Sequence, residues 1–431
     1  MSVSLLRRAC LVALLSLPLA ARAEGRAVLD ISGAQFKPLP LALAPLQGPA
    51  AATQPLGATL TSDLELSGLF QLLDPRSFLA SPGEGLSASD IDFSKWAAVG
   101  ASSLVKGQIS GDARGYKVEL RLFDVTRGTQ TLKVSYTGKA PQLRRLAHDF
   151  ANLVYRFFTG EKGIFRTRLA FVKRIGASKQ IYLSDFDGHD AVPLTRGSGL
   201  NLLPAWSPDG RQVAFTSFRG GAPMLYVEGV DGKGEHAVHP EGALQTGAAF
   251  SPDGKRLAFT MSVHGNSDIW VMNVDGTGLK DLTDSREIES SPAWSPDGKR
   301  LAFVSKRSGD PQIFVMNADG SHVERLTFQG TYNQTPDWSP RGDEIAFTAR
   351  DERNVFDLFT VNVETKEIKR LTQDQGNNEE PSFSPNGRHL VFSSTRQGGR
   401  SELFLMRADG TNQRALGVMD ASTPAWGPWT N

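Results

Sequence analysis

The chain has 431 residues, with 47 lysine and arginine residues against 46 aspartate and glutamate residues, and 40% of its residues are hydrophobic. This length favours two domains over one, and the near balance of charge gives no electrostatic argument for binding nucleic acid or anionic lipid. The single cysteine, Cys10, excludes intramolecular disulfides and thiolate metal sites.

The first 23 residues have the pattern of a secretory signal peptide. Arg7 and Arg8 precede an apolar stretch over residues 9–20 that is too short to span a bilayer. Residues 21–23 read Ala-Arg-Ala, a small-x-small cleavage site. We therefore predict an exported protein that is cut after Ala23, which leaves 44 basic and 46 acidic residues.

Residues 24–36 would then form a newly cut N-terminal end with few apolar residues. Such ends stay mobile unless they dock. Two interpretations remain open for this segment: a partner-binding arm, or a plain edge strand or frayed tail, with residues 27–31 as the strand.

Residues 37–160 lack any repeat and predict an α+β domain. We expect a strand over residues 39–46, a helix over 59–70, and a three-stranded antiparallel meander over 104–136. The clearest helix is predicted over residues 141–158, where apolar residues recur at helical spacing and Gly160 can take a left-handed conformation at the end. Residues 161–167 would link this domain to the next.

Residues 168–431 contain a repeat of about 44 residues. Its marker is a phrase close to Pro-Ala-Trp-Ser-Pro-Asp-Gly, first seen over residues 204–210 and clipped in its sixth copy over 424–428. An apolar strand ending in Phe follows, then a third strand ending in Asp-Gly, and a short fourth ending in Leu-Thr. Four strands at this period predict the blade of a β-propeller.

The elements at the two ends of the repeat region indicate how the ring closes. Residues 169–195 supply a second, third and fourth strand without a first, whereas residues 424–426 supply a first strand alone. Together they make one blade, and joining them removes two free sheet edges. We predict a two-domain protein: an N-terminal α+β domain followed by a six-bladed β-propeller closed by a C-terminal strand.

No motif for catalysis, a metal ion or a cofactor emerges from the sequence. Propellers with this turn phrase also accompany prolyl-oligopeptidase-like domains, but the Gly-x-Ser-x-Gly phrase of those hydrolases does not occur. The aromatic residues of the repeated phrase are expected to pack between blades rather than bind sugar. We therefore predict no enzyme, no catalytic residue, no metal ligand and no cofactor.

The loops that lead into the six innermost strands are unlike one another, although the blades repeat. They should converge at one end of the ring and form a surface for a protein or peptide. Plain solvated loop tips are the alternative. The candidate contact residues are Leu202, Leu244, Gln245, Thr246, Glu289, Ser290, Asn333, Gln334, Asn378, Glu379, Glu380 and Ser422.

The signal peptide, the α+β domain, the junction over residues 155–171 and the six repeats together resemble the TolB family of the Tol-Pal system along the whole chain. The resemblance implies a periplasmic, non-enzymatic scaffold that supports outer-membrane integrity and constriction during cell division. It implies that the loop residues named above bind the lipoprotein Pal. It also implies that the arm binds TolA, with Glu24, Arg26, Val28, Leu29, Asp30 and Ile31 as candidates.

A rival hypothesis keeps the propeller but makes it an enzyme. A calcium-dependent hydrolase or lactonase would use the carboxylates at the channel, with Glu379 and Glu380 as the residues to change. Turnover and tight calcium binding would favour it, whereas capture of a lipoprotein without turnover favours the scaffold.

Overall fold

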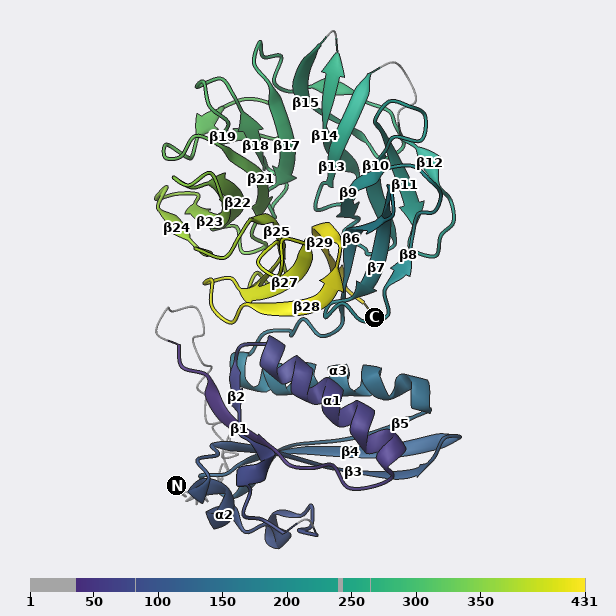
Figure 1. Ribbon diagram of the computed structural model, residues 1–431, viewed down its shortest axis with the longest axis vertical. Coiled ribbons are helices and arrows are strands. Elements are labelled where there is room, and N and C mark those ends of the chain that lie inside the picture. The colour runs from purple at the N-terminus through teal and green to yellow at the C-terminus, as the bar shows by residue number, and fades with distance from the viewer. Residues whose placement is uncertain (1–35, 82, 239–242, 264, 431) are drawn as a thin grey trace, which may run out of the picture.

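The computed structural model describes residues 36–81, 83–238, 243–263 and 265–430. It shows a small α/β domain beside a ring of six blades, which confirms the predicted fold class (Figure 1). The signal peptide, the strand at residues 27–31 and the six candidate residues of the arm lie outside the described residues.

The N-terminal domain contains one five-stranded sheet with the order β2-β1-β3-β4-β5. The predicted meander is confirmed as β3, β4 and β5, which pair antiparallel. The sequence did not indicate that β1 pairs in parallel with both β2 and β3. The strands are β1 (Leu39–Leu43), β2 (Phe70–Leu72), β3 (Ser103–Asp112), β4 (Gly115–Asp124) and β5 (Thr129–Gly138).

Two long helices, α1 (Ala50–Leu66) and α3 (Leu143–Thr159), lie between this sheet and the propeller (Figure 1). Helix α3 and its left-handed cap at Gly160, with φ of 71°, match the prediction. The helix predicted over residues 59–70 was wrong at both ends, because α1 starts after Pro49, contains Pro55 and ends before β2. The short helix α2 (Phe93–Ala98) covers the other face of the sheet through Trp96.

The two domains share a continuous apolar core. Leu60 and Phe150, from α1 and α3, belong to the same buried cluster as Phe186 and Val418 of the propeller. All four side chains are at most 6% exposed. The helices are therefore packed on both sides, by their own sheet and by the blades next to them.

The propeller consists of six four-stranded antiparallel sheets. The first complete blade is β9 (Asn201–Trp206), β10 (Gln212–Ser217), β11 (Met224–Gly229) and β12 (His236–Ala237), and the second is β13 (Leu244–Phe250), β14 (Arg256–Val263), β15 (Asn266–Asn273) and β16 (Lys280–Asp281). The third is β17 (Glu289–Trp294), β18 (Arg300–Ser305), β19 (Gln312–Asn317) and β20 (Glu324–Arg325). The fourth is β21 (Asn333–Trp338), β22 (Glu344–Arg350), β23 (Phe356–Asn362) and β24 (Ile368–Arg370), and the fifth is β25 (Asn378–Phe383), β26 (His389–Ser394), β27 (Glu402–Arg407) and β28 (Arg414–Met419).

The sixth blade closes the ring in the way the repeat count predicted. The C-terminal strand β29 (Ala421–Trp429) pairs antiparallel with β6 (Thr167–Ile175), which continues to β7 (Ser178–Asp185) and β8 (Val192–Pro193). The innermost strand of this blade thus comes from the C-terminus, whereas its other three strands come from the start of the repeat region. This arrangement leaves no unpaired inner edge at the closure.

The repeated phrase builds the hairpin between the first two strands of each blade. In the first copy, Asp209 Oδ1 accepts hydrogen bonds from Ser207 Oγ at 2.6 Å and from the Arg211 amide at 3.0 Å. Gly210 has φ of 69°, which favours glycine. The aromatic residue just before this turn packs between blades, as predicted: Trp294 is 7% exposed and its Nε1 donates to Ala249 O at 3.2 Å.

Candidate partner-binding face

The inner strand of each blade starts after a loop whose sequence differs between blades, and it ends at a Ser-Pro-x-Gly or equivalent turn. These loops and these turns therefore lie at opposite ends of the ring. We call the end with the loops the mouth and the end with the turns the hairpin end. The Asp-Gly turns after the third strands also lie at the hairpin end, because successive strands of a blade are antiparallel. The mouth is therefore built from residues at the starts of the inner strands.

Six of the predicted residues occupy one equivalent position, the second residue of an inner strand or the third in β13. Each is half-buried. One comes from every blade: Leu202, Thr246, Ser290, Gln334, Glu379 and Ser422. The structure thus brings these six side chains together around one end of the ring.

The next residue in every inner strand has a positive φ, a feature that the sequence did not indicate. The six values lie between 49° and 61°, at Leu203, Gly247, Ser291, Thr335, Glu380 and Thr423. The pairing register shifts at each of these points, which identifies a β-bulge. Because a bulge interrupts the alternation of a strand, two successive residues of each inner strand are half-buried here instead of one.

Hydrogen bonds from one blade to the next hold the bulges. The amides of Ser291 and Glu380 donate to Thr260 Oγ1 and Thr348 Oγ1 of the preceding blade, at 3.1 and 3.0 Å. Gly247 makes the same bond to Thr216 Oγ1 at 3.1 Å. The backbone of the mouth is consequently fixed, and only its side chains vary between blades.

Four other predicted residues are buried instead of facing a partner. Gln245, Glu289, Asn333 and Asn378 are at most 1% exposed. Asn333 Nδ2 donates to Gln312 Oε1 at 2.9 Å, and Asn378 Nδ2 donates to Asp357 Oδ1 at 3.0 Å, so these side chains join neighbouring blades. We remove all four from the candidate contact residues.

Glu289 is the most consequential of the four, because the sequence suggested an exposed acid. Its carboxylate accepts hydrogen bonds from Ser305 Oγ at 2.8 Å and from Arg307 Nη2 at 2.9 Å. Arg307 also lies over the rings of Phe303 and Phe314, at 5.8 and 5.5 Å. Glu289 thus orients an arginine that packs on the aromatic residues of its own blade.

The Leu-Thr repeat marks a structural network that the sequence did not reveal. Thr327 Oγ1 donates to Gln312 Oε1 at 2.7 Å and accepts from the Ile313 amide at 2.9 Å. Thr372 makes the same pair of bonds, to Asp357 and from Leu358. The regular Leu-Thr spacing was a usable signal for this network, which joins the fourth strand to the third and to the next blade.

The mouth combines apolar and acidic side chains. Leu244 is 49% exposed, and Ile288, which leads into the next inner strand, is 48% exposed. Glu380 accepts from Thr423 Oγ1 at 3.1 Å and lies beside Glu379. Burial raises the pKa of Glu380, and burial together with the charge of Glu380 raises the pKa of Glu379.

A cavity of about 380 Å³ opens beside these two acids. Its lining includes Arg174, Lys179 and Arg400 in addition to Glu379 and Glu380. Both signs of charge are therefore present, with carboxylates that can accept hydrogen bonds and cationic groups that can donate them. Such a lining suits a polar peptide or protein surface.

The hairpin end carries the N-terminal domain. Glu161, in the segment between the domains, accepts from Arg388 Nη2 at 2.6 Å and Nε at 3.0 Å, and from Arg341 Nη1 at 3.3 Å. His389 is 1% exposed and its Nε2 lies 3.0 Å from Ser67 O. These contacts involve the turns of the fourth and fifth blades, so the mouth faces away from them.

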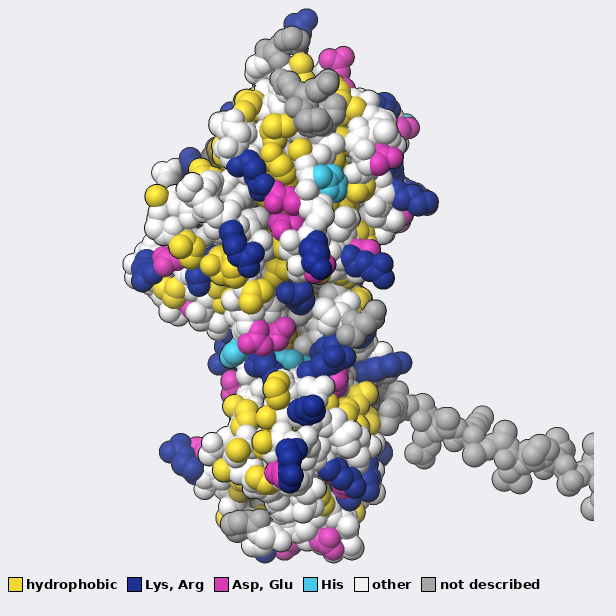
Figure 2. Space-filling view, turned by 90° about the vertical axis from the view of Figure 1, so that its right-hand side faces the viewer, with side chains coloured by type: hydrophobic (Ala, Val, Ile, Leu, Met, Phe, Trp, Pro, Cys, Tyr) yellow, Lys and Arg dark blue, Asp and Glu magenta, His cyan; other side chains and the backbone are white. Residues whose placement is uncertain are grey.

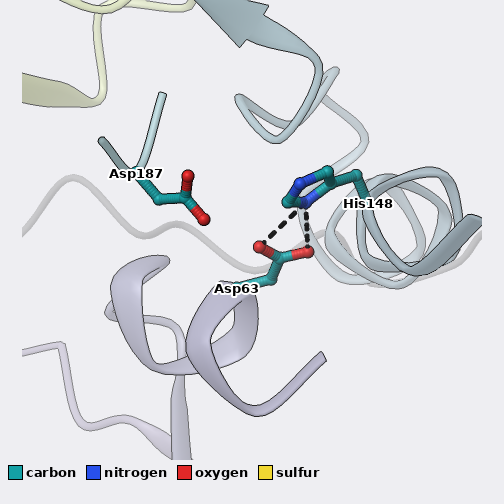
Figure 3. A group of neighbouring side chains, drawn as sticks. All are labelled: Asp63, His148 and Asp187. Atoms are coloured by element: carbon teal, nitrogen blue, oxygen red, sulfur yellow. Dashed lines mark hydrogen bonds and ion pairs between the residues drawn. The ribbon is translucent and has the colours of Figure 1, made fainter. Parts of the chain in front are cut away.

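A second group of contacts joins the domains near the sixth blade. Asp63 of α1 and His148 of α3 form a buried pair, with His148 Nδ1 at 2.8 and 3.0 Å from the two carboxylate oxygens. Asp187, from the turn between β7 and β8, lies beside them (Figure 3). Its carboxylate accepts a hydrogen bond from Arg144 of α3. This interface is therefore polar at its centre and apolar around it.

A groove beside the fifth blade holds the first described residue. Phe36 lies under the guanidinium of Arg407, 4.7 Å from the ring centre. The groove has a volume of about 400 Å³ and is also lined by Phe70 and Asn412. Phe36, the residue that follows the arm in the sequence, thus lies at the junction of the two domains.

Figure 2 shows one face of the molecule with hydrophobic, basic and acidic side chains interspersed over both domains. Within the part of the chain that the structure describes, no helix is both long and apolar enough to cross a membrane.

The fold is that of a two-domain protein in which an N-terminal α/β domain precedes a six-bladed β-propeller. The family model of the TolB beta propeller domain matches residues 155–430, and that of the TolB amino-terminal domain matches residues 27–131. The chain belongs to the TolB family, as the resemblance predicted.

Individual relatives agree with this assignment. The chain is 50% identical over 210 residues to the Tol-Pal system protein TolB of Myxococcus xanthus, a match that covers 48% of each chain. It is 45% identical over 219 residues to that of Anaeromyxobacter dehalogenans, covering 49% of this chain and 50% of the relative. The matched part thus spans about half the length of these relatives. The crystal structure of TolB from Acinetobacter baumannii has a TM-score of 0.80 at 28% identity and covers 93% of this chain and 99% of that one.

Proposed function

We propose that this chain is a periplasmic scaffold of the Tol-Pal system that binds the lipoprotein Pal at the mouth of its propeller and TolA through residues 24–35. In this role it supports outer-membrane integrity and constriction during cell division. Membership of the TolB family and the Tol-Pal names of the relatives support the system. The residue assignments rest on the geometry of the mouth and on the sequence of the arm.

The observation that carries the Pal proposal is the ring of unlike side chains on a fixed backbone. At the equivalent position of the six inner strands, leucine, threonine, glutamine and glutamate occur once each and serine twice, whereas the bulge beneath it is the same in all six. A surface that was needed only for folding would repeat its side chains as the hairpin turns do. The retained contact residues are Leu202, Leu244, Thr246, Ser290, Gln334, Glu379, Glu380 and Ser422.

The chemistry of these residues suits a mixed contact. Leu244 and the neighbouring Ile288 offer exposed apolar area on one side, and Glu379 and Glu380 offer acceptors on the other. Protein interfaces commonly combine an apolar centre with polar groups that fix the orientation. We expect Pal to place apolar groups near Leu244 and hydrogen-bond donors near Glu379.

Changing the charge of Glu379 tests directly whether Pal binds at the mouth. The affinity is measured by titration calorimetry with Pal from the same bacterium. Glu379→Lys should weaken Pal binding at least tenfold, because it replaces an acceptor by a like-charged group beside the donors of the partner. The matched control is Glu364→Lys, an equal change of charge at an exposed turn of the hairpin end. Equal affinity for both variants, with unchanged melting temperatures, would show that Pal binds elsewhere.

The arm is tested by removing residues 24–35. The shortened chain should lose TolA binding and keep Pal binding, because the described residues that form the mouth and its cavity all belong to the propeller. A shortened chain that still binds TolA with full affinity would refute the arm proposal. Capture of both partners without hydrolysis of a lactone would also separate the scaffold from a calcium-dependent propeller enzyme.

A further inference from the structure

Three titratable side chains from three separate elements meet at the interface of the two domains. Asp63 comes from α1, His148 from α3, and Asp187 from the turn between β7 and β8 (Figure 3). None of them belongs to the mouth or to the arm. Their exposed fractions are 0%, 3% and 3%, so the group is removed from bulk water.

The geometry of the group fits a bound cation. One ligand atom from each residue can be chosen so that all three lie within 4.8 Å of one another. Imidazole nitrogen and carboxylate oxygen bind zinc at about 2.0–2.2 Å, so small side-chain adjustments would bring the three atoms onto one ion. The three residues also approach from different directions, as tetrahedral coordination requires (Figure 3).

His148 supplies a second, independent observation. Its Nδ1 faces Asp63, but its Nε2 is buried and has no hydrogen-bond partner among the described residues. A buried nitrogen without a partner is costly, and such an atom in a native protein commonly indicates a missing water or ion. An ion bound by both Asp63 and His148 would take the lone pair of Nδ1, the nitrogen that faces Asp63, and the proton on the buried Nε2 would then need a water molecule as its acceptor.

The charged groups around His148 also favour a bound cation. Asp63 and Asp187 bring two buried carboxylates, and Arg144 brings a guanidinium that donates to Asp187 and lies 3.5 Å from Asp185. The Nδ1 atom of His189 lies 3.4 Å from Oδ1, the other carboxylate oxygen of Asp187.

We propose that Asp63, His148 and Asp187 form a binding site for a divalent transition-metal ion, with zinc as the expected ion, that ties the propeller to the N-terminal domain. The imidazole favours zinc over calcium and magnesium, which prefer sites made of oxygen alone. Arg144 and His189 hold the carboxylate of Asp187 in place, as outer partners of metal ligands commonly do. A cavity of about 200 Å³ beside His148 can supply a water molecule as a further ligand.

The site has consequences for the interface. One ion would bind two helices of the N-terminal domain and a turn of the sixth blade, so it stabilises the docked arrangement of the domains by mass action.

The test uses the full mature chain after removal of metals with a chelator. Zinc titrated into it at pH 7.5 should bind one ion per chain in calorimetry and raise the melting temperature. His148→Gln should weaken this binding at least tenfold. His236→Gln, a change of an exposed histidine in a propeller loop, should leave it unchanged.

Cobalt provides a readout that does not depend on any variant. Its visible absorption in the unaltered chain should show the intense bands of a site with few ligands, and zinc should abolish them. Absence of saturable zinc binding and of cobalt bands would overturn the proposal and leave the group as a hydrogen-bonded contact. Zinc binding that survives both His148→Gln and Asp63→Asn would also overturn it, because the ion would then lie elsewhere.

Discussion

The two ends of the propeller differ in how much their residues vary from blade to blade. At the hairpin end the turns repeat almost unchanged, and contacts from two of the blades hold the N-terminal domain through Glu161 and His389. At the mouth five kinds of side chain, with serine occurring twice, stand on the same bulged backbone. The repeated turns thus build the ring, whereas residues that depart from the repeat, such as Arg341 and His389, dock the N-terminal domain. The irregular residues of the mouth are left for recognition.

The same distinction holds between neighbouring residues of one strand. Glu289 is fully buried and paired with Arg307, whereas Ser290, the next residue, faces the mouth. Unlike residues near a loop are therefore not equivalent candidates for binding. The direction of each side chain, which depends on the bulge, decides between structure and recognition.

The largest expected effect comes from breaking the buried pair at the mouth. Glu289→Ala should lower the free energy of unfolding by about 2–4 kcal/mol, because Ser305 and Arg307 lose their acceptor. Ser290→Ala should change it by less than about 0.5 kcal/mol. Urea unfolding of both variants measures the difference, and equal stabilities would contradict a structural role for the Glu289 carboxylate.

Asp337 offers a pH-dependent test within the ring. It stands where four of the other blades have alanine, and its Oδ2 accepts from the Phe383 amide at 2.6 Å. Burial raises the pKa of Asp337 to about 7, above the value near 3.8 of an unfolded chain. The folded protein therefore holds more protons than the unfolded one across this window, and stability falls as the pH rises from about 4 to 7.

Asp337→Asn removes this charge and keeps an acceptor of similar shape. The variant should be more stable than the parent by about 1–3 kcal/mol at pH 8, with water around the half-buried side chain reducing the effect. The advantage should vanish near pH 4, where both chains carry a neutral group. Melting temperatures across this range would contradict the account if the difference did not depend on pH.

A smaller effect is expected at the hairpin end. Glu161→Ala removes the carboxylate that Arg388 and Arg341 share and should cost about 1 kcal/mol, because the group is partly exposed. Arg388 lowers the pKa of Glu161, so this contribution is present above about pH 4.5 and is lost as the pH falls further. Faster proteolysis of residues 161–167 than in the Glu364→Ala control would report the loosened junction.

Much of the fold could be predicted because its signals are local and repeated. The proline spacing gives six blades, the two incomplete sets of strands give the closure, and the helical spacing gives α3. The start of α1 was missed because Pro55 and Gly57 lie inside the helix, where both residues normally disfavour helical structure. The parallel pairing of β1 depends on contacts distant in sequence, which no local pattern encodes.

The candidate site was only partly predictable. The unlike loops indicated which end of the ring to consider, but the bulges had no signal, since leucine, serine, threonine and glutamate all adopt the left-handed conformation there. Gln245, Glu289, Asn333 and Asn378 were therefore assigned to the surface although they are buried. The cluster of Asp63, His148 and Asp187 was missed because its members come from three distant segments.

Hydrogen exchange measured with and without Pal tests the difference between the two ends most directly. We expect Pal to slow exchange at the mouth, in residues 201–204, 244–248, 289–292, 333–336, 378–381 and 421–424, and to leave the Ser-Pro-x-Gly turns of the hairpin end unchanged. Protection confined to the turns, with none at the mouth, would contradict the assignment of the irregular end to recognition.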